Sequence, residues 1–283
     1  MRIAVIGKSG QLAQSIAFVG KDYNHPIQFI GKEDLDITDT LSVESALNEF
    51  APEVLINCSA YTEVDAAEEN ELIAEALNVK AIRVLVDVCK RHKIFLIHVS
   101  TDYVFDGKSK KPYIETDLTN PQTVYGKTKL EGENAVLKSD LPSIVIRTSW
   151  LYSPFGRNFY KTIRQKIEEQ SILSVVNDQI GVPTSALDLA RVLLKMAEKN
   201  AEFTKPELFH VSNSGSATWY KFAIAIRDFL HSTHSINPVS SETFATKAKR
   251  PSYSVLSTKK LENRLGIQMR QWHKALEEVI LLS

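Results

Sequence analysis

Tyr125 and Lys129 are the residues best suited to acid–base chemistry, and they stand four positions apart in the run Val124–Leu130. If this run is helical, the two side chains lie one turn apart on the same face. A phenol titrates near about pH 10, and a neighbouring ammonium favours the phenolate, so we expect Lys129 to lower the Tyr125 pKa toward neutrality. A phenol tuned in this way can donate the proton in the reduction of a carbonyl group.

A second stretch that could take part in this chemistry is Ser100–Asp102, which follows the apolar run Phe95–Val99. Open α/β sheets place their chemistry at the carboxyl ends of strands, where these hydroxyl groups would lie. The alternative is that Ser100 and Thr101 only cap a turn. A Tyr–Lys pair can arise by chance in a chain with nine tyrosines, so the prediction depends on Thr101 lying close to it.

The N-terminal apolar run Met1–Ile6 leads into Gly7 and Gly10, with Ala13 at the third small position. This spacing predicts a strand, a tight glycine turn and a helix, with the pyrophosphate of a dinucleotide at the helix N-terminus. An ordinary turn between strand and helix is the alternative.

The cofactor type depends on the end of the next predicted strand, Ile27–Ile30. An acid there binds the ribose hydroxyl of NAD, whereas a cation suits the phosphate of NADP. Lys32 favours NADPH, while Glu33 leaves NADH possible.

These motifs need a scaffold of alternating strands and helices, which the apolar periodicity supplies. The predicted strands are Met1–Ile6, Ile27–Ile30, Val54–Ile56, Phe95–Val99, Ser143–Thr148 and Leu208–Ser212. The predicted helices include Ser42–Phe50, Glu71–His92, Asn158–Glu168, Asp188–Lys199, Trp219–Leu230 and Trp272–Leu282. We therefore expect an α/β fold with a doubly wound, Rossmann-type parallel sheet and a smaller C-terminal substrate-binding lobe. Residues 1–150, rejoined by 184–212, form the predicted NADP-binding domain, and 151–183 with 213–283 form the lobe.

Composition excludes several classes of partner. The chain has 34 basic and 34 acidic residues, so its net charge is zero and we expect no nucleic acid partner. No apolar run is long enough for a membrane span, and the first apolar run is too short for a signal peptide. The two cysteines suggest no disulfide framework. We expect a cytoplasmic protein without a membrane partner, and no metal, because no His-x-x-x-His or Cys-x-x-Cys spacing occurs.

One basic loop, Lys247–Arg250 followed by Pro251, could clamp a phosphorylated substrate through the guanidinium of Arg250. A solvated loop is the alternative.

Together these motifs resemble the dTDP-4-dehydrorhamnose reductase family of the extended short-chain dehydrogenase/reductase superfamily. The resemblance rests on Gly7-x-x-Gly10-Gln11-Leu12, Asp36-Ile37-Thr38, Ala60-Tyr61-Thr62-x-Val64-Asp65, Ser100-Thr101-Asp102-Tyr103-Val104-Phe105-Asp106-Gly107, Val124-Tyr125-Gly126-x-x-Lys129-Leu130-x-Gly132-Glu133, Arg147-Thr148-Ser149-Trp150, Asp178-Gln179-x-Gly181-x-Pro183-Thr184 and Arg250-Pro251. It implies NADPH-dependent reduction of the C4 keto group of dTDP-4-dehydro-6-deoxy-L-mannose to dTDP-L-rhamnose, in polysaccharide biosynthesis.

The resemblance also implies roles for individual residues. Tyr125 would protonate the oxygen at C4, Thr101 would hydrogen-bond it, and Lys129 would bind the nicotinamide ribose. The implied cofactor-binding residues are Gly7, Ser9, Gly10, Gln11, Leu12, Lys32, Asp36, Ile37, Ser59, Ala60, Tyr61, Tyr125 and Lys129. The implied binding residues for the dTDP-sugar are Val64, Thr101, Tyr103, Tyr125, Trp150, Asn158 and Arg250.

Some features depart from the family pattern or leave alternatives open. Ala13 replaces a more usual glycine. Gln14-Ser15 occupies the place where some relatives hold a metal between subunits, so the chain could be a monomer or a homodimer. Another nucleotide-sugar epimerase or dehydratase is an alternative function, although a dehydratase typically has a second carboxylate where Tyr103 stands. A non-catalytic NADP-binding regulatory subunit is a further alternative.

Overall fold

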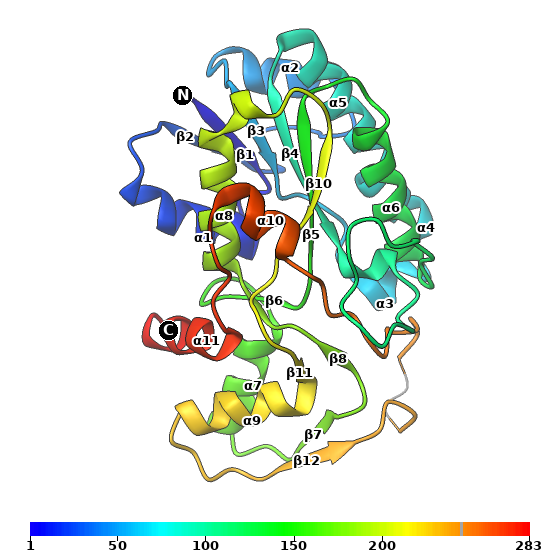
Figure 1. The fold of residues 1–283 in the computed structure, drawn as a ribbon, viewed down its shortest axis with the longest axis vertical. Helices are drawn as coiled ribbons and strands as arrows, with labels where there is room; N and C mark the ends of the chain where they lie inside the picture. The colour runs from blue at the N-terminus through cyan, green and yellow to red at the C-terminus, as the bar shows by residue number, and fades with distance from the viewer. Residues whose placement is uncertain (244–245) are drawn as a thin grey trace.

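The computed structural model describes residues 1–243 and 246–283, and a six-stranded parallel sheet forms its centre (Figure 1). The strands lie in the order β10-β5-β4-β3-β1-β2. They are β1 (Ile3–Ile6), β2 (Ile27–Ile30), β3 (Val54–Asn57), β4 (Phe95–Thr101), β5 (Ser143–Thr148) and β10 (Glu207–His210). The chain winds from β1 to β2 on one side and then crosses to β3 on the other, so a topological switch point lies between β1 and β3. The predicted doubly wound sheet is confirmed.

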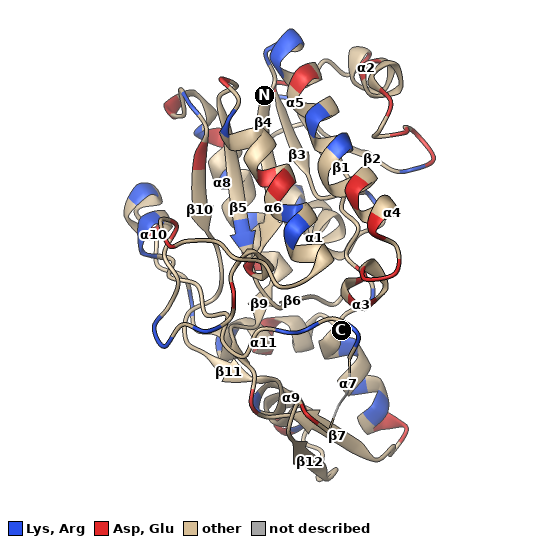
Figure 2. Ribbon diagram, turned by 90° about the vertical axis from the view of Figure 1, so that its right-hand side faces the viewer, with Lys and Arg blue, Asp and Glu red and all other residues tan. Residues whose placement is uncertain are grey.

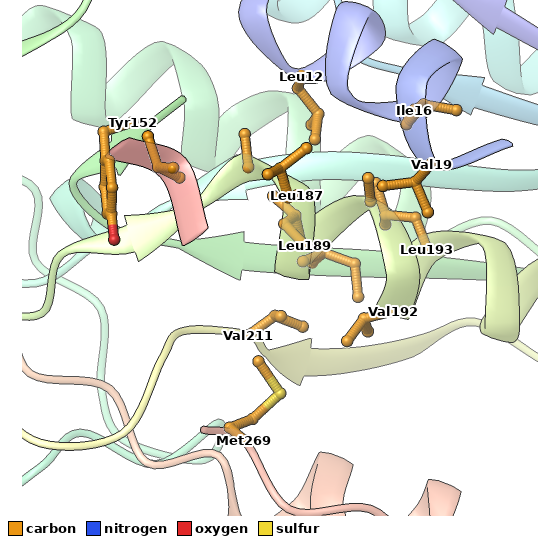
Figure 3. Packing of buried hydrophobic residues seen from close by; sticks show 14 of the residues in the cluster. Leu12, Ile16, Val19, Tyr152, Leu187, Leu189, Val192, Leu193, Val211 and Met269 are labelled. Carbon is orange, nitrogen blue, oxygen red and sulfur yellow. The ribbon is translucent and has the colours of Figure 1, made fainter. Parts of the chain in front are cut away.

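Helices cover both faces of this sheet, and the strand residues alternate between two apolar clusters. Val5 and Ile56 pack with α1 (Gln11–Val19) and α8 (Ala186–Glu198). Ala4 and Leu55 pack in the second cluster, which is completed by α2 (Thr40–Asn48), α5 (Ala81–His92) and α6 (Val124–Leu137). Figure 3 shows Leu12, Ile16 and Val19 of α1 against Leu187 and Leu193 of α8. Each such buried side chain stabilises the fold by about 1.5–3 kcal/mol.

The segment predicted as one helix, Glu71–His92, is instead interrupted. It consists of α4 (Glu71–Glu75), a π-helical turn (Ala76–Lys80) and α5. Gly132 of α6 packs against this turn, and a Cβ there would lie 2.1 Å from the carbonyl oxygen of Asn78. The turn therefore brings α6 and the 71–92 segment into unusually close backbone contact.

The C-terminal lobe lies below the carboxyl edge of the sheet in Figure 1. Its helices are α7 (Phe159–Glu168), α9 (Trp219–Phe229) and α11 (Trp272–Leu281). Its short strands pair β12 (Ile236–Val239) with β7 (Leu173–Val176), β11 (Ala217–Thr218) with β8 (Ile180–Gly181), and β6 (Leu151–Tyr152) with β9 (Thr184–Ser185). The chain returns to the sheet at α10 (Lys259–Leu265), where Lys260 donates to the carbonyl oxygen of Leu208 at 2.7 Å.

Basic and acidic residues are interspersed over the molecule (Figure 2). Within residues 1–243 and 246–283, no helix combines the length and apolar character needed to cross a membrane.

Candidate active site

The glycine turn lies at the switch point of the sheet. Gly7 has φ +102°, and a Cβ there would meet backbone atoms of Cys58 and Ser59 at 3.0 Å. Only glycine combines this backbone conformation with such close contact between the ends of β1 and β3. Gly10 closes the turn with an N–H···O bond of 2.8 Å to Gly7 and precedes the first turn of α1, whose backbone N–H groups have no partner among the described residues and suit an anion.

The predicted cofactor residues of this turn present mainly their backbone. Leu12 is 5 % exposed and packs in the core (Figure 3). Gln11 donates through Nε2 to the Leu151 carbonyl at 3.2 Å and accepts from the Ser153 hydroxyl at 3.3 Å. Gln11 therefore also ties the turn to the first residues of the C-terminal lobe. Ser9 is exposed.

The end of β2 carries a free cation. Lys32 is exposed and forms no ion pair within the part of the chain that the structure describes. Glu33, which made the cofactor type ambiguous, lies 3.2 Å from the ammonium of Lys8. The Asp36 carboxylate accepts bonds of 2.9 and 2.7 Å from Thr38, so its side chain shapes the turn before α2, and Ile37 is buried.

The end of β3 is held by two buried asparagines. Ser59 donates through N–H and Oγ to Asn57 at 3.0 and 2.6 Å. Asn78, on the π-helical turn, accepts from the Tyr61 N–H at 2.9 Å and donates to the Tyr61 carbonyl and the Thr128 hydroxyl. Asn57 and Asn78 thus hold the two ends of the Ser59–Tyr61 stretch, which has Ala60 at its centre, and Asn78 ties it to the helix that carries Tyr125.

Thr101, Tyr125 and Lys129 come together beside this loop. Thr101 ends β4, while Tyr125 and Lys129 lie in the first two turns of α6. The Thr123 hydroxyl caps that helix by accepting from the Gly126 N–H at 3.0 Å. Thr101, Tyr125 and Lys129 are 5 %, 9 % and 2 % exposed, and the Thr101 hydroxyl lies close enough to the phenol to affect its pKa.

The predicted lowering of the Tyr125 pKa is wrong. Burial raises this pKa, the neighbouring Thr101 hydroxyl lowers it less, and Asp102 in its ionised form raises it further. The Nζ of Lys129 donates to the Val99 carbonyl oxygen at 2.6 Å. Burial also lowers the pKa of Lys129 to about 8, against the opposing effect of Glu133. Tyr125 therefore carries its proton at neutral pH, as a proton donor must.

A buried ion pair beneath α6 was missed by the sequence analysis. Arg147 of β5 forms a bidentate pair with Glu133 of α6, and the two side chains are 3 % and 1 % exposed. The Ser100 hydroxyl also donates to Glu133, at 3.0 Å. Burial and the charge of Arg147 lower the pKa of the adjacent His210 to about 3, so this imidazole is neutral. We call Ser100, Glu133, Arg147 and His210 the Glu133 network.

The predicted sugar-binding residues Val64 and Tyr103 surround Tyr125 in one small apolar cluster, together with Tyr61. The rings of Tyr103 and Tyr125 meet edge to face, with centroids 5.5 Å apart. Trp150 has φ +47° and stacks on Trp219 at 3.5 Å. The sequence analysis also did not single out Trp219, because aromatic residues at the start of an amphipathic helix usually belong to the core.

Two residues predicted to face the diphosphate already have protein partners. Asn158 caps α7, accepting from the Lys161 N–H at 3.1 Å, and donates to the carbonyl groups of Ser153 and Phe155. Arg250 pairs with Asp65 at 2.7 Å and donates to the Tyr103 hydroxyl at 3.3 Å. The Lys247–Arg250 loop therefore lies across α3 (Val64–Ala67), beside Tyr103.

A cavity of about 510 Å³ opens at this place, lined among others by Tyr103, Gln179 and Arg250. A larger hollow of about 840 Å³ lies by Phe95, at the opposite end of β4 from Thr101. The smaller cavity adjoins the chemistry, so it is the better candidate for the substrate. Within the described residues, no cluster of His, Cys, Asp and Glu could hold a metal ion.

Comparisons with known proteins cover the chain from end to end. Residues 1–282 match the family model described as the RmlD substrate binding domain. The dTDP-4-dehydrorhamnose reductase of Aggregatibacter actinomycetemcomitans is 39 % identical over 287 residues, covering 98 % of each chain. The dTDP-4-keto-6-deoxy-D-glucose reductase of Streptomyces niveus is 36 % identical, covering 99 % of this chain and 97 % of that protein.

A solved structure agrees with these matches. The crystal structure of Bacillus anthracis dTDP-4-dehydrorhamnose reductase in complex with NADP superposes with a TM-score of 0.93 at 33 % identity, covering 100 % of this chain and 99 % of that one. Both the sequence and the fold match over the whole length. The chain therefore belongs to the dTDP-4-dehydrorhamnose reductase family.

Proposed function

We propose that this enzyme uses NADPH to reduce the C4 keto group of dTDP-4-dehydro-6-deoxy-L-mannose, giving dTDP-L-rhamnose for polysaccharide biosynthesis. One observation carries the proposal: Thr101, Tyr125 and Lys129 meet at the carboxyl edge of the sheet, next to a glycine turn at its switch point. The family membership of the whole chain supports it.

The residues around the turn fit a dinucleotide. Gly7 leaves room for close backbone approach, and the N–H groups of Gln11 and Leu12 in the first turn of α1 suit a pyrophosphate. Lys32, which is exposed and forms no ion pair with the described residues, suits a ribose phosphate, and this favours NADPH over NADH. When bound, NADPH supplies the hydride that the carbonyl carbon receives.

The side chains of the site handle the oxygen at C4. Tyr125, protonated because it is buried, gives its proton to that oxygen, so the ketone becomes a hydroxyl group. Thr101 donates a hydrogen bond to the same oxygen and stabilises the negative charge that develops there. Lys129 holds the nicotinamide ribose from the second turn of α6.

The sugar would lie between the sheet and the C-terminal lobe. Val64, Tyr103 and Trp150 face it, and Asn158 and Arg250 bind the diphosphate. In this proposal, residues 1–150 with 184–212 bind the cofactor, whereas 151–183 and 213–283 hold the dTDP-sugar. The cavity beside Tyr103 and Arg250 supports this placement.

A second candidate substrate is dTDP-4-keto-6-deoxy-D-glucose, because the Streptomyces niveus relative is named for its reduction. The two keto-sugars differ in configuration, and the chemistry at C4 is the same. A dehydratase is disfavoured because Tyr103 stands where the second carboxylate would be.

The loss of NADPH absorbance with each keto-sugar tests the proposal, with UDP- and GDP-linked analogues alongside. We expect the highest kcat/KM for dTDP-4-dehydro-6-deoxy-L-mannose. The Tyr125→Phe variant, which lacks the proposed proton donor, serves as the negative control for NADPH oxidation. Oxidation of NADPH by none of the 4-keto sugars would contradict the proposal.

A further inference from the structure

Asp102 is a buried carboxyl group next to Thr101, and the reaction proposed above gives it no role. It follows Thr101 directly and is 2 % exposed. Its Oδ1 lies 3.1 Å from the Thr101 hydroxyl, whereas its Oδ2 has no hydrogen-bond partner among the described residues. In its ionised form it also raises the pKa of Tyr125.

No basic group of the site neutralises this carboxyl. Arg147 pairs with Glu133, and Arg250 pairs with Asp65. Lys129 donates to the carbonyl group of Val99. A buried carboxylate ion with one vacant oxygen and no cation is costly, so the site favours the neutral acid.

The hydrogen bonds of Thr101 show why the protonation of Asp102 matters. A hydroxyl group has one proton and two lone pairs. One lone pair of Thr101 accepts the N–H of Tyr103 at 3.2 Å. If Asp102 is ionised, it takes the only hydroxyl proton of Thr101, and none is left for the keto oxygen. If Asp102 is neutral, its O–H fills the second lone pair, and the proton of Thr101 points to the substrate.

We propose that Asp102 acts as a neutral acid that donates to Thr101 and thereby makes Thr101 a donor to the keto oxygen. This inference rests on the proposed reductase function. Asp102 is a positioning residue, since its own proton never leaves it. The proton that ends on the sugar oxygen comes from Tyr125.

The titration of Asp102 agrees with this geometry. Burial raises its pKa to about 6, against the opposing effects of the nearby Ser254 and Thr101 hydroxyl groups, so the neutral acid predominates below about pH 6. Ser254 approaches from the C-terminal lobe, but its hydroxyl completes no hydrogen bond within the described residues. The other groups that face Asp102 are Tyr103 and Tyr125, whose pKa values burial raises. Since the neutral form is the active one, its contribution is present below the Asp102 pKa and lost above it.

Four variants test this arrangement: Asp102→Ala, Asp102→Asn, Thr101→Val and the double variant Asp102→Ala/Thr101→Val. We expect Asp102→Ala to lower kcat by about ten- to a hundredfold with little change in KM, since an oriented donor is lost. Asp102→Asn should recover much of this loss, because its amide N–H can donate to Thr101. In the double variant, Asp102→Ala should add little to the effect of Thr101→Val.

The pH dependence separates this role from a structural one. Wild-type kcat should fall with rising pH on a limb that Asp102→Asn abolishes, whereas a limb near pH 8 from Lys129 should remain. Asp140→Asn is the control, since Lys90 lowers the pKa of that exposed carboxyl. Melting temperature and NADPH binding are measured for every variant. Equal kcat for wild type and Asp102→Ala, additive effects in the double variant, or an unchanged limb in Asp102→Asn would each overturn the inference.

A direct measurement does not depend on turnover. The carboxyl carbon of ¹³C-labelled Asp102, assigned with Asp102→Asn, should titrate well above an ordinary aspartate. Titration near about pH 4 would overturn the inference even if the reductase function holds. Failure to reduce any 4-keto sugar, with the raised titration present, would contradict the reductase function alone.

Discussion

Tyr125 carries the proton that the proposed reaction consumes, and burial keeps that proton in place at neutral pH. The sequence predicted the residue and its helical spacing to Lys129, but it predicted the wrong direction for the pKa. Burial depends on the packing of Tyr61, Val64 and Tyr103 around the ring, which are distant in sequence. Spacing along one helix says nothing of such contacts.

We expect Tyr125→Phe to lower kcat by about 10²- to 10⁴-fold, because a general acid is lost. The phenol acts in the transition state, so NADPH affinity should remain nearly unchanged. Steady-state kinetics and a fluorescence titration with NADPH measure the two quantities. A kcat close to wild type would remove Tyr125 from the role of proton donor.

For Arg250, too, the sequence predicted a role but not the contacts that the side chain makes. Its ion pair with Asp65 was not predictable, because the two residues come from opposite ends of the chain. The guanidinium has five N–H groups. Among the described residues it donates one hydrogen bond to Asp65 and one to Tyr103, so donors remain for a phosphate.

We expect Arg250→Ala to raise KM for the nucleotide-sugar by about ten- to a hundredfold, since a charge-assisted contact of about 1.5–3 kcal/mol is lost. Arg250→Lys should recover only part, because an ammonium lacks the planar fork. Asp65→Asn is the informative companion. It should leave KM unchanged or lower it if Arg250 binds phosphate. A KM in Asp65→Asn as high as in Arg250→Ala would instead assign the pair to holding the loop.

At the scale of elements, α6 is the helix whose position matters most. It carries Tyr125 and Lys129, and the Glu133 network fixes it to β4, β5 and β10. The sequence predicted every strand of the central sheet within a few residues, because buried parallel strands are short apolar runs. It did not predict the π-helical turn, since the apolar periodicity continues through it, or the Glu133–Arg147 pair, since its partners lie on different elements.

We expect Glu133→Gln to lower the free energy of unfolding by about 3–5 kcal/mol, because the buried guanidinium of Arg147 loses its counter-charge. Urea denaturation measures this loss. Glu168→Gln is the matched control, since its partner Arg164 is 31 % exposed. That substitution should lower the free energy of unfolding by only about 0.3–0.5 kcal/mol. Similar small losses for both variants would show that the buried pair contributes little.

The connection between β2 and α2 sets the cofactor preference in this account. Lys32→Ala should weaken NADPH by about tenfold and NADH much less, because only NADPH carries the ribose phosphate. Binding titrations with both cofactors measure this difference. Lys21→Ala, an exposed lysine beyond α1, serves as the control. Equal losses for both cofactors in Lys32→Ala would show that Lys32 does not contact the phosphate.

At the scale of the whole molecule, the sheet and its smaller lobe were predictable from the alternation of strands and helices. The strand pairs of the lobe were not. β12 pairs with β7, and β11 with β8, across long separations in the chain, and strands of two to four residues carry too little pattern to set such pairings. The stacking of Trp219 on Trp150 therefore follows from the three-dimensional structure of the lobe and not from the sequence.

The central claim, reduction at C4 by direct hydride transfer, is tested most directly with deuterium. NADPH in which both hydrogens at C4 of the nicotinamide are replaced by deuterium is incubated with dTDP-4-dehydro-6-deoxy-L-mannose, and the product is examined by NMR. The account predicts dTDP-L-rhamnose with deuterium at C4 of the sugar and at no other carbon. A product without deuterium at C4, or with deuterium at C3 or C5, would contradict it.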